Sequence, residues 1–208
     1  FAFDKRNSFF VITIITIHIM RKLLFLSFTI VLALSLPVNS MNAQTSKKEL
    51  REILKSLQNE KEIDVTIDMS RVIIHGYSES DFVYRENLRS DKDWPTLWET
   101  EYKPELNQKF MNALNLQIFD YGHSVRFGNF GKAKYQIRLI VSSISEKGDI
   151  ILNGYIIDRE QQFVLCKLFI SGTGGTFGSK VNLMGDGFTR AGKELARQMN
   201  ILFKRGRI

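Results

Sequence analysis

The residues best suited to chemistry follow a predicted strand, where His75 is succeeded by two carboxylates, Glu79 and Asp81. An imidazole beside a carboxylate can form a general acid–base pair, and both groups ligate metals. Metal sites usually need three or four converging ligands, and His123 lies in an unrelated sequence context. We interpret His75 as a strand-end residue and predict no metal or cofactor. The alternative is a periplasmic hydrolase-like enzyme that uses His75 with Asp81 or Glu79.

Cys166 is the only cysteine in the sequence. A reactive thiol needs a neighbouring histidine or cation that lowers its pKa, and none lies nearby in the sequence. Cys166 instead alternates with Val164 and Leu168, which is typical of the inner face of a strand. We predict that all three residues face the core and that Cys166 has no chemical role.

A glycine-rich segment, 172–179, follows the last predicted strand and resembles a phosphate loop only superficially. The Walker pattern ends in Gly-Lys-Ser/Thr, whereas Gly178, Ser179 and Lys180 stand in another order. Phe177 occupies the place of the third glycine of the dinucleotide pattern. We expect the loop to act through shape, either by packing with positive φ under Phe177 or by offering N–H groups to a partner. The candidate binding residues here are Gly174, Gly175, Phe177, Ser179 and Lys180.

Trp94, Trp98 and Tyr102 recur at helical spacing. Such an aromatic stripe can stack on sugars or peptides. The simpler interpretation, which we favour, is that it covers the sheet. Trp94 and Trp98 are kept as candidate binding residues.

The elements that would position these residues follow from hydrophobic periodicity. Residues 133–172 alternate as three strands with short polar turns, which predicts an antiparallel meander. Other strands are expected at 63–74 and, as an edge strand, at 117–121. Helices are expected at 46–59, from Ser78, from Trp94 and from Asp186 or Gly187. The pattern predicts an α/β fold of the α+β type, a two-layer sandwich in which helices cover an antiparallel-rich sheet.

The N-terminal region reads as an export signal. Met20, Arg21 and Lys22 precede an apolar run at 23–36, which is typical of a secretory signal peptide. Cleavage is expected after Ser40 or Ala43. The alternative is a retained membrane anchor, and no cysteine stands near either site to carry a lipid.

We therefore divide the chain into four parts. Residues 1–19 are interpreted as upstream translation or a fragment, and 20–43 as the signal peptide. An N-terminal amphipathic helix at 44–61 precedes a single α/β domain at 62–208. The expected location is periplasmic or secreted, without lipidation, so membrane contact is expected only through the signal segment.

The charge of the chain does not indicate a nucleic-acid partner. The net charge is +7, and the predicted signal segment holds four Lys or Arg against one Asp, which leaves +4. No basic stripe interleaved with aromatic residues is evident. We therefore exclude nucleic acid as a partner.

Three stretches carry a resemblance to a protein group. Tyr135–Val141, Ile157-Asp158 and Gly174–Ser179 before a terminal helix resemble secreted Bacteroidetes proteins of unknown function, and Asn42-Ala43-Gln44 is similar to the end of their export signals. The element order also resembles the periplasmic α/β domain of the lipoproteins CsgG and LpoB. This chain lacks their lipid-bearing cysteine. The resemblance implies an exported, non-enzymatic envelope domain that binds a protein or cell-wall component, with the oligomeric state left open.

Overall fold

The computed structural model describes residues 47–207, within one compact unit at 45–208. The predicted signal peptide and its cleavage sites lie outside the described residues. The helices are α2 (Lys47–Asn59), α3 (Glu79–Leu88), α4 (Trp94–Leu97), a π-helical turn η1 (Trp98–Tyr102), α5 (Lys103–Asp120) and α6 (Lys180–Arg207). The strands are β1 (Glu62–Asp68), β2 (Ile73–Ile74), β3 (Tyr77–Ser78), β4 (Arg126–Gly128), β5 (Tyr135–Ile144), β6 (Ile150–Asp158) and β7 (Phe163–Gly172).

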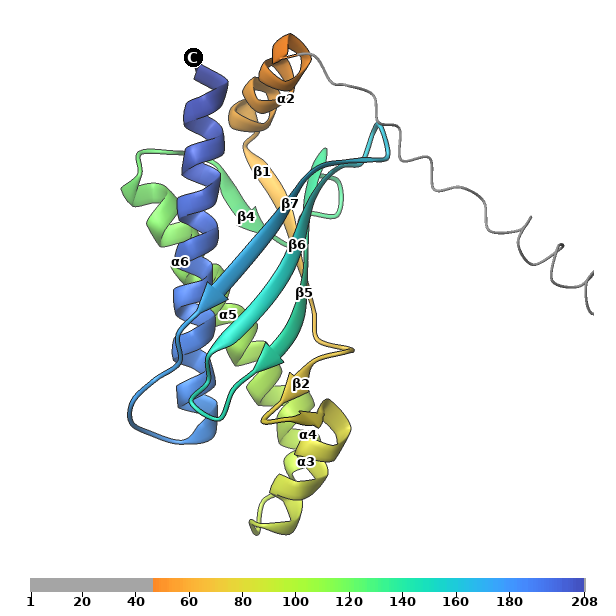
Figure 1. The fold of residues 1–208 in the computed structure, drawn as a ribbon, viewed down its shortest axis with the longest axis vertical. Helices are drawn as coiled ribbons and strands as arrows, with labels where there is room; N and C mark the ends of the chain where they lie inside the picture. The colour runs from red at the N-terminus through yellow and green to blue at the C-terminus, as the bar shows by residue number, and fades with distance from the viewer. Residues whose placement is uncertain (1–46, 208) are drawn as a thin grey trace, which may run out of the picture. The chain divides into compact units, whose positions relative to one another are not determined.

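The seven strands form one mixed sheet, and the predicted meander is present as β5, β6 and β7 (Figure 1). Its two long ladders are antiparallel, whereas β1 pairs in parallel with both β4 and β5. The short β2 adds in parallel to β5 and forms a hairpin with β3. The predicted α/β class with a meander is confirmed, and the parallel pairings of β1 are an addition to it.

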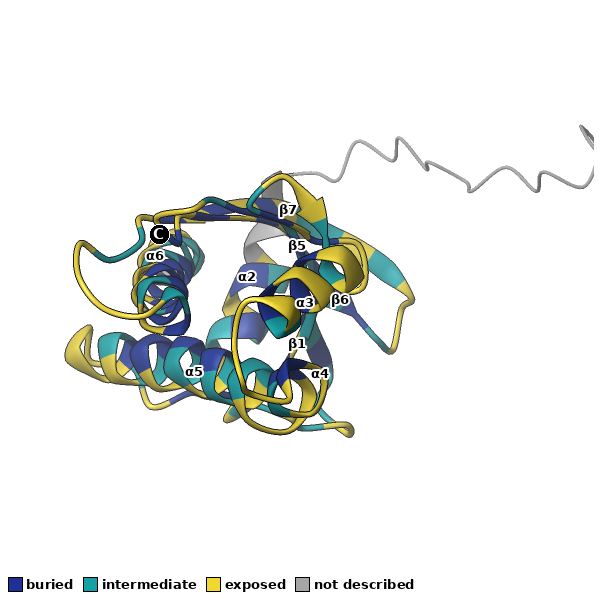
Figure 2. Cartoon of the chain, turned by 90° about the horizontal axis from the view of Figure 1, so that it is seen from below, coloured by how far each residue is buried: buried dark blue, intermediate teal, exposed yellow. Residues whose placement is uncertain are grey.

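The helices form the second layer. Figure 2 shows α5 and α6 side by side, with the curved sheet wrapped around them. Helix α2 packs on the C-terminal half of α6 at one end of the molecule, while α3 and α4 lie at the other end (Figure 1). Within 47–207 no helix combines the length and apolar character needed to cross a bilayer.

The core lies between the sheet and the α5–α6 pair. Ile137, Leu139 and Val141 of β5 are fully buried, as the alternation predicts. They pack in one cluster with the apolar stripe of α6, which includes Phe188 and Leu195. Burying each such side chain stabilises the fold by about 1.5–3 kcal/mol.

The edge strand predicted at 117–121 is wrong, because α5 continues through this segment to Asp120. Phe110, Leu114 and Ile118 are spaced by four residues and are all buried, so the segment extends a helical face. The edge strand is β4, a few residues later, and it pairs with β1.

The predicted start of the last helix is also wrong. Helix α6 begins at Lys180, because Ser179 Oγ accepts a hydrogen bond from the Asn182 backbone N–H at 3.2 Å and caps the helix. The glycines at 185–187 had indicated a break. Gly187 instead allows close approach, since a Cβ there would lie 2.0 Å from the Gly148 carbonyl oxygen.

A β-bulge in β7 alters one predicted face. The β6–β7 register shifts so that Ile156 pairs with Cys166 and Ile157 pairs with Val164. Val164 is consequently turned outward and is 49% exposed, so its predicted inward position is wrong. Cys166 packs against the core, and burial raises the pKa of its thiol.

Candidate functional site

His75 lies in a tight turn between β2 and β3. His75 and Gly76 both have positive φ, 53° and 84°, as in the turns that join two-residue hairpins. The His75 backbone N–H donates to the Ile144 carbonyl oxygen at 2.9 Å, which attaches the turn to the end of β5. The imidazole packs edge-on against Phe82 of α3, with 5.0 Å between ring centroids. The turn therefore holds the imidazole in a defined position.

The two carboxylates predicted to assist His75 are engaged elsewhere. Glu79 accepts a hydrogen bond from Trp98 Nε1 at 2.7 Å and pairs with Lys103 at 2.6 Å. Asp81 accepts a hydrogen bond from the Ser78 hydroxyl at 2.7 Å, at the N-terminus of α3. Both therefore stabilise α3 and its contact with η1, and the structure does not bring either into a pair with His75.

A different set of charged side chains surrounds His75. A cavity of ≈ 410 Å³ lies between the β2–β3 hairpin, α3, the start of α6 and the β5–β6 turn. Lys180 Nζ donates to Glu86 Oε1 at 2.5 Å, and Arg89 approaches the same oxygen at 3.3 Å. Arg85 stacks on the Tyr77 ring at 4.0 Å. The cavity is lined by His75, Tyr77, Phe82, Arg85, Glu86, Arg89, Glu146, Lys180 and Leu183.

The Nε2 atom of His75 is buried, and none of residues 47–207 forms a hydrogen bond with it. Burial, and then the Lys180 ammonium, hold the pKa of His75 below its ordinary value of 6.5, while Glu146 and Glu86 oppose this shift. The imidazole is therefore neutral at pH 7.

This shift predicts a pH dependence of stability. Between the lowered pKa of folded His75 and 6.5, the unfolded chain binds more protons than the folded chain. The free energy of unfolding should therefore fall as the pH drops through that window and be fully present above it. Urea titrations across this range should show the fall in the wild type. His75→Asn tolerates positive φ and should lose this component; an unchanged profile in the variant would contradict the assignment.

His123 belongs to a separate environment. It hydrogen-bonds Asn200 Oδ1 at 3.0 Å and packs against Phe203, near the far end of α6. Lys180, beside His75, lies about 30 Å away along that helix. The two histidines do not converge on one site.

The glycine-rich loop is shaped by close packing. A Cβ on Gly174 would lie 1.7 Å from the Lys147 carbonyl oxygen, and one on Gly175 would lie 2.5 Å from Asp186 Oδ2. Of the loop glycines, only Gly178 has positive φ. Phe177 does not cover the loop as expected, because it is 90% exposed.

The polar residues after the loop also have structural partners. Ser179 caps α6, and Lys180 pairs with buried Glu86. Their replacement by alanine, which the sequence alone predicts to be harmless to the fold, is therefore expected to lower stability. Of the candidate residues chosen from the sequence, Lys180 is the one that lines the cavity beside His75.

The aromatic stripe faces inward. Trp98 is 1% exposed, and Trp94 is also buried. Both rings contact Phe82 edge-on, with centroid distances of 5.9 Å for Trp94 and 5.6 Å for Trp98. The favoured interpretation, that the stripe covers the sheet, agrees with this burial, and neither ring presents a free face for stacking on a sugar.

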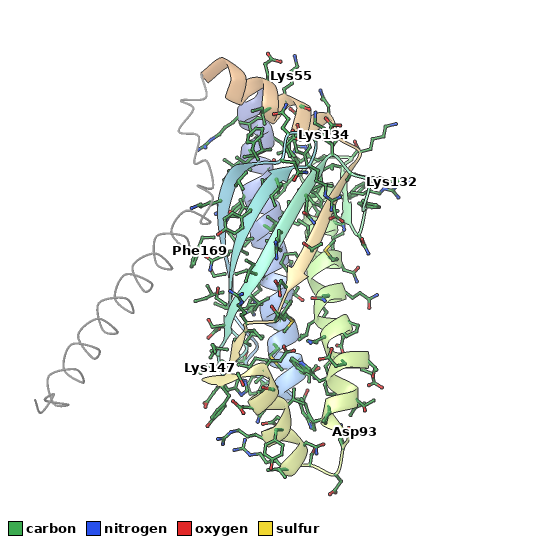
Figure 3. The ribbon with its side chains drawn as sticks, turned by 90° about the vertical axis from the view of Figure 1, so that its right-hand side faces the viewer. Lys55, Asp93, Lys132, Lys134, Lys147 and Phe169 are labelled. Carbon is green, nitrogen blue, oxygen red and sulfur yellow. The ribbon has the colours of Figure 1, made fainter. Side chains whose placement is uncertain are left out.

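A second surface lies on the sheet itself. We define the outer face as the outward side chains of β5, β6 and β7, on the side opposite α5 and α6. Phe169, labelled in Figure 3, is 62% exposed, and Ile151 and Val164 are also exposed. Arg138, Tyr155 and Lys167 form one cross-strand row between such apolar residues. Sequence reasoning did not select this face, although the apolar residues on both faces of β7 were a signal for it.

Comparisons with known proteins find remote structural likenesses. No protein-family model matches the chain, and no curated protein does. A PelC dodecamer structure from Paraburkholderia phytofirmans is 8% identical, with a TM-score of 0.35, covering 64% of this chain and 87% of its own. Protein XCC0632 from Xanthomonas campestris, of DUF330, is 13% identical, with a TM-score of 0.38, covering 71% and 87%. Likenesses this remote say nothing about activity or assembly, and the resemblance to Bacteroidetes proteins, CsgG and LpoB stays a prediction.

Proposed function

We propose that this chain is an exported, non-enzymatic domain of the cell envelope that binds a protein through the outer face. The observation that carries the proposal is the exposure of Phe169, Val164 and Ile151 on neighbouring strands. Contiguous apolar patches on a protein surface mark interaction sites far more often than scattered single residues do. A ten-residue strand at the sheet edge, β7, adds to this surface.

The charges on the outer face define the chemistry of the partner. Arg138 and Lys167 are the charged residues among those that point outward from the meander, and Tyr155 lies between them. Arg138 also approaches Asp68 of β1 at 3.7 Å, a distance at which an exposed pair is weak. The fitting occupant is therefore a protein surface that sets acidic residues beside apolar ones.

The positions of the candidate catalytic groups support a non-enzymatic role. Glu79 and Asp81 are bonded within their own helix environment. The Cys166 thiol, whose pKa burial raises, is not an activated nucleophile. A hydrolase built on His75 with Asp81 or Glu79 would have to break these contacts first.

The test compares two exposed phenylalanines on opposite sides of the molecule. A partner captured from envelope extract is identified, purified and titrated against the full chain. Phe169→Glu should weaken binding tenfold or more, because it places a charge in the apolar contact and repels an acidic partner. Phe119→Glu, on the 75% exposed Phe119 of α5, should leave the affinity unchanged.

Other occupants of the outer face give distinct results. Sedimentation of the purified chain that shows self-association abolished by Phe169→Glu would replace the partner by a second copy. Binding to anionic lipid vesicles with the same sensitivity would replace it by a membrane surface. Equal effects of the two substitutions on partner binding would remove the outer face as the binding site.

A further inference from the structure

We propose that the cavity beside His75 binds the carboxylate of a small organic ligand. This goes beyond the partner surface proposed above, because none of the outer-face residues lines the cavity. The inference rests on the balance of charge, on an unsatisfied buried nitrogen and on the apolar part of the walls.

The charge balance of the cavity favours a monoanion. Three cationic side chains, Arg85, Arg89 and Lys180, face two carboxylates, Glu86 and Glu146, which leaves one net positive charge. Lys180 and Arg89 both pair with Glu86. Arg85 stacks on Tyr77 and forms no ion pair within 47–207, so its guanidinium is the group available to a carboxylate.

The Nε2 atom of His75 supplies a second contact. A buried nitrogen without a partner costs about 1–3 kcal/mol, and a ligand oxygen would remove that cost. In the Nε2–H tautomer the neutral imidazole donates to a carboxylate oxygen. The ring is held there by a non-glycine residue at positive φ, a conformation that clusters at ligand sites.

The remaining walls select an organic ligand over a bare inorganic anion. Tyr77, Phe82 and Leu183 contribute apolar surface next to the charged groups. The volume of ≈ 410 Å³ lies in the range of small-molecule sites. A carboxylate joined to an apolar body fills both halves of the cavity, and a free organic acid and the C-terminus of a peptide share this chemistry.

The probes are N-acetylphenylalanine, its neutral amide and inorganic phosphate, each titrated into the full chain. Trp94 and Trp98 are the two tryptophans of the sequence, and both contact Phe82 in the cavity wall, so intrinsic fluorescence reports on occupancy. We expect saturable binding of the acid at or below about 1 mM, and binding at least tenfold weaker for the amide and for phosphate. A peptide ending in phenylalanine that binds tenfold tighter than the acid would identify a peptide C-terminus as the source, and equal affinity would identify a free acid.

Two variants test the residues, and a third is the matched control. Arg85→Gln and His75→Asn should each weaken binding of the acid tenfold or more, while Arg138→Gln, an arginine on the outer face, should not. Thermal unfolding establishes that each variant is folded, and binding of the acid should raise the NMR pKa of His75. No binding of the acid by the wild type up to about 10 mM, or equal affinity for acid and amide, would overturn the proposal. Neither result would alter the outcome for Phe169, so the two proposals fail separately.

Discussion

Replacing Asp64 with alanine is expected to lower the free energy of unfolding by about 3 kcal/mol. The Asp64 side chain is 2% exposed and pairs with Arg159 at 2.5 Å. It also accepts hydrogen bonds from the Phe130 backbone N–H at 2.8 Å and from Gln136 Nε2 at 3.0 Å. One carboxylate therefore joins β1, the loop before β5, β5 itself and the β6–β7 turn. Removing it leaves three donors unpaired in a mostly buried setting.

Asp68→Ala on the same strand is the matched control. Asp68 is partly exposed, and its pairing with Arg138 at 3.7 Å is weak. The loss there should stay below about 1 kcal/mol. Urea unfolding of both variants and the wild type measures the difference, and an Asp64→Ala loss no larger than that of Asp68→Ala would show that the buried network contributes little.

Gly174→Ala is expected to lower the free energy of unfolding by about 2–3 kcal/mol. A Cβ at this position would lie 1.7 Å from the Lys147 carbonyl oxygen and 2.5 Å from the Gly148 carbonyl carbon. Neither atom can move independently, because Gly148 is itself wedged against the Leu183 backbone of α6. The reason is steric overlap of three backbone segments, since Gly174 does not have positive φ.

Gly131→Ala provides the comparison for this effect. A Cβ on Gly131 meets nothing within 4 Å. Its substitution should change stability by less than about 0.5 kcal/mol. Thermal or urea unfolding of the two alanine variants measures the contrast. Similar stabilities would mean that the loop relaxes freely and that its glycines are not required for packing.

Much of the fold could be predicted from local pattern. Alternation in β5 and β6 predicted the meander, because a strand with one buried face repeats every two residues. Ser78 and Trp94-Pro95 marked helix starts through capping and the first-turn preference of proline. These signals depend on neighbours within a few residues, so one sequence contains them in full.

The errors in element boundaries arose where distant contacts overrode the local signal. The glycines of α6 read as a break, yet they allow the helix to approach the Gly148 carbonyl oxygen and keep their helical conformation. The bulge in β7 is set by its register against β6, and it reversed the predicted face of Val164. Neither partner is a sequence neighbour.

The candidate site shows the same division. The sequence singled out His75 and Lys180 for separate reasons and paired His75 with carboxylates close to it in the chain. Tertiary structure gave Glu79 and Asp81 other partners and placed Glu86 beside Lys180, 94 residues away in sequence. Residue type and local spacing determine which groups could react or bind, whereas the packing of α3, α6 and the β2–β3 turn decides which of them meet. The physical reason is that this packing is the joint optimum of many long-range apolar contacts, which no local pattern contains.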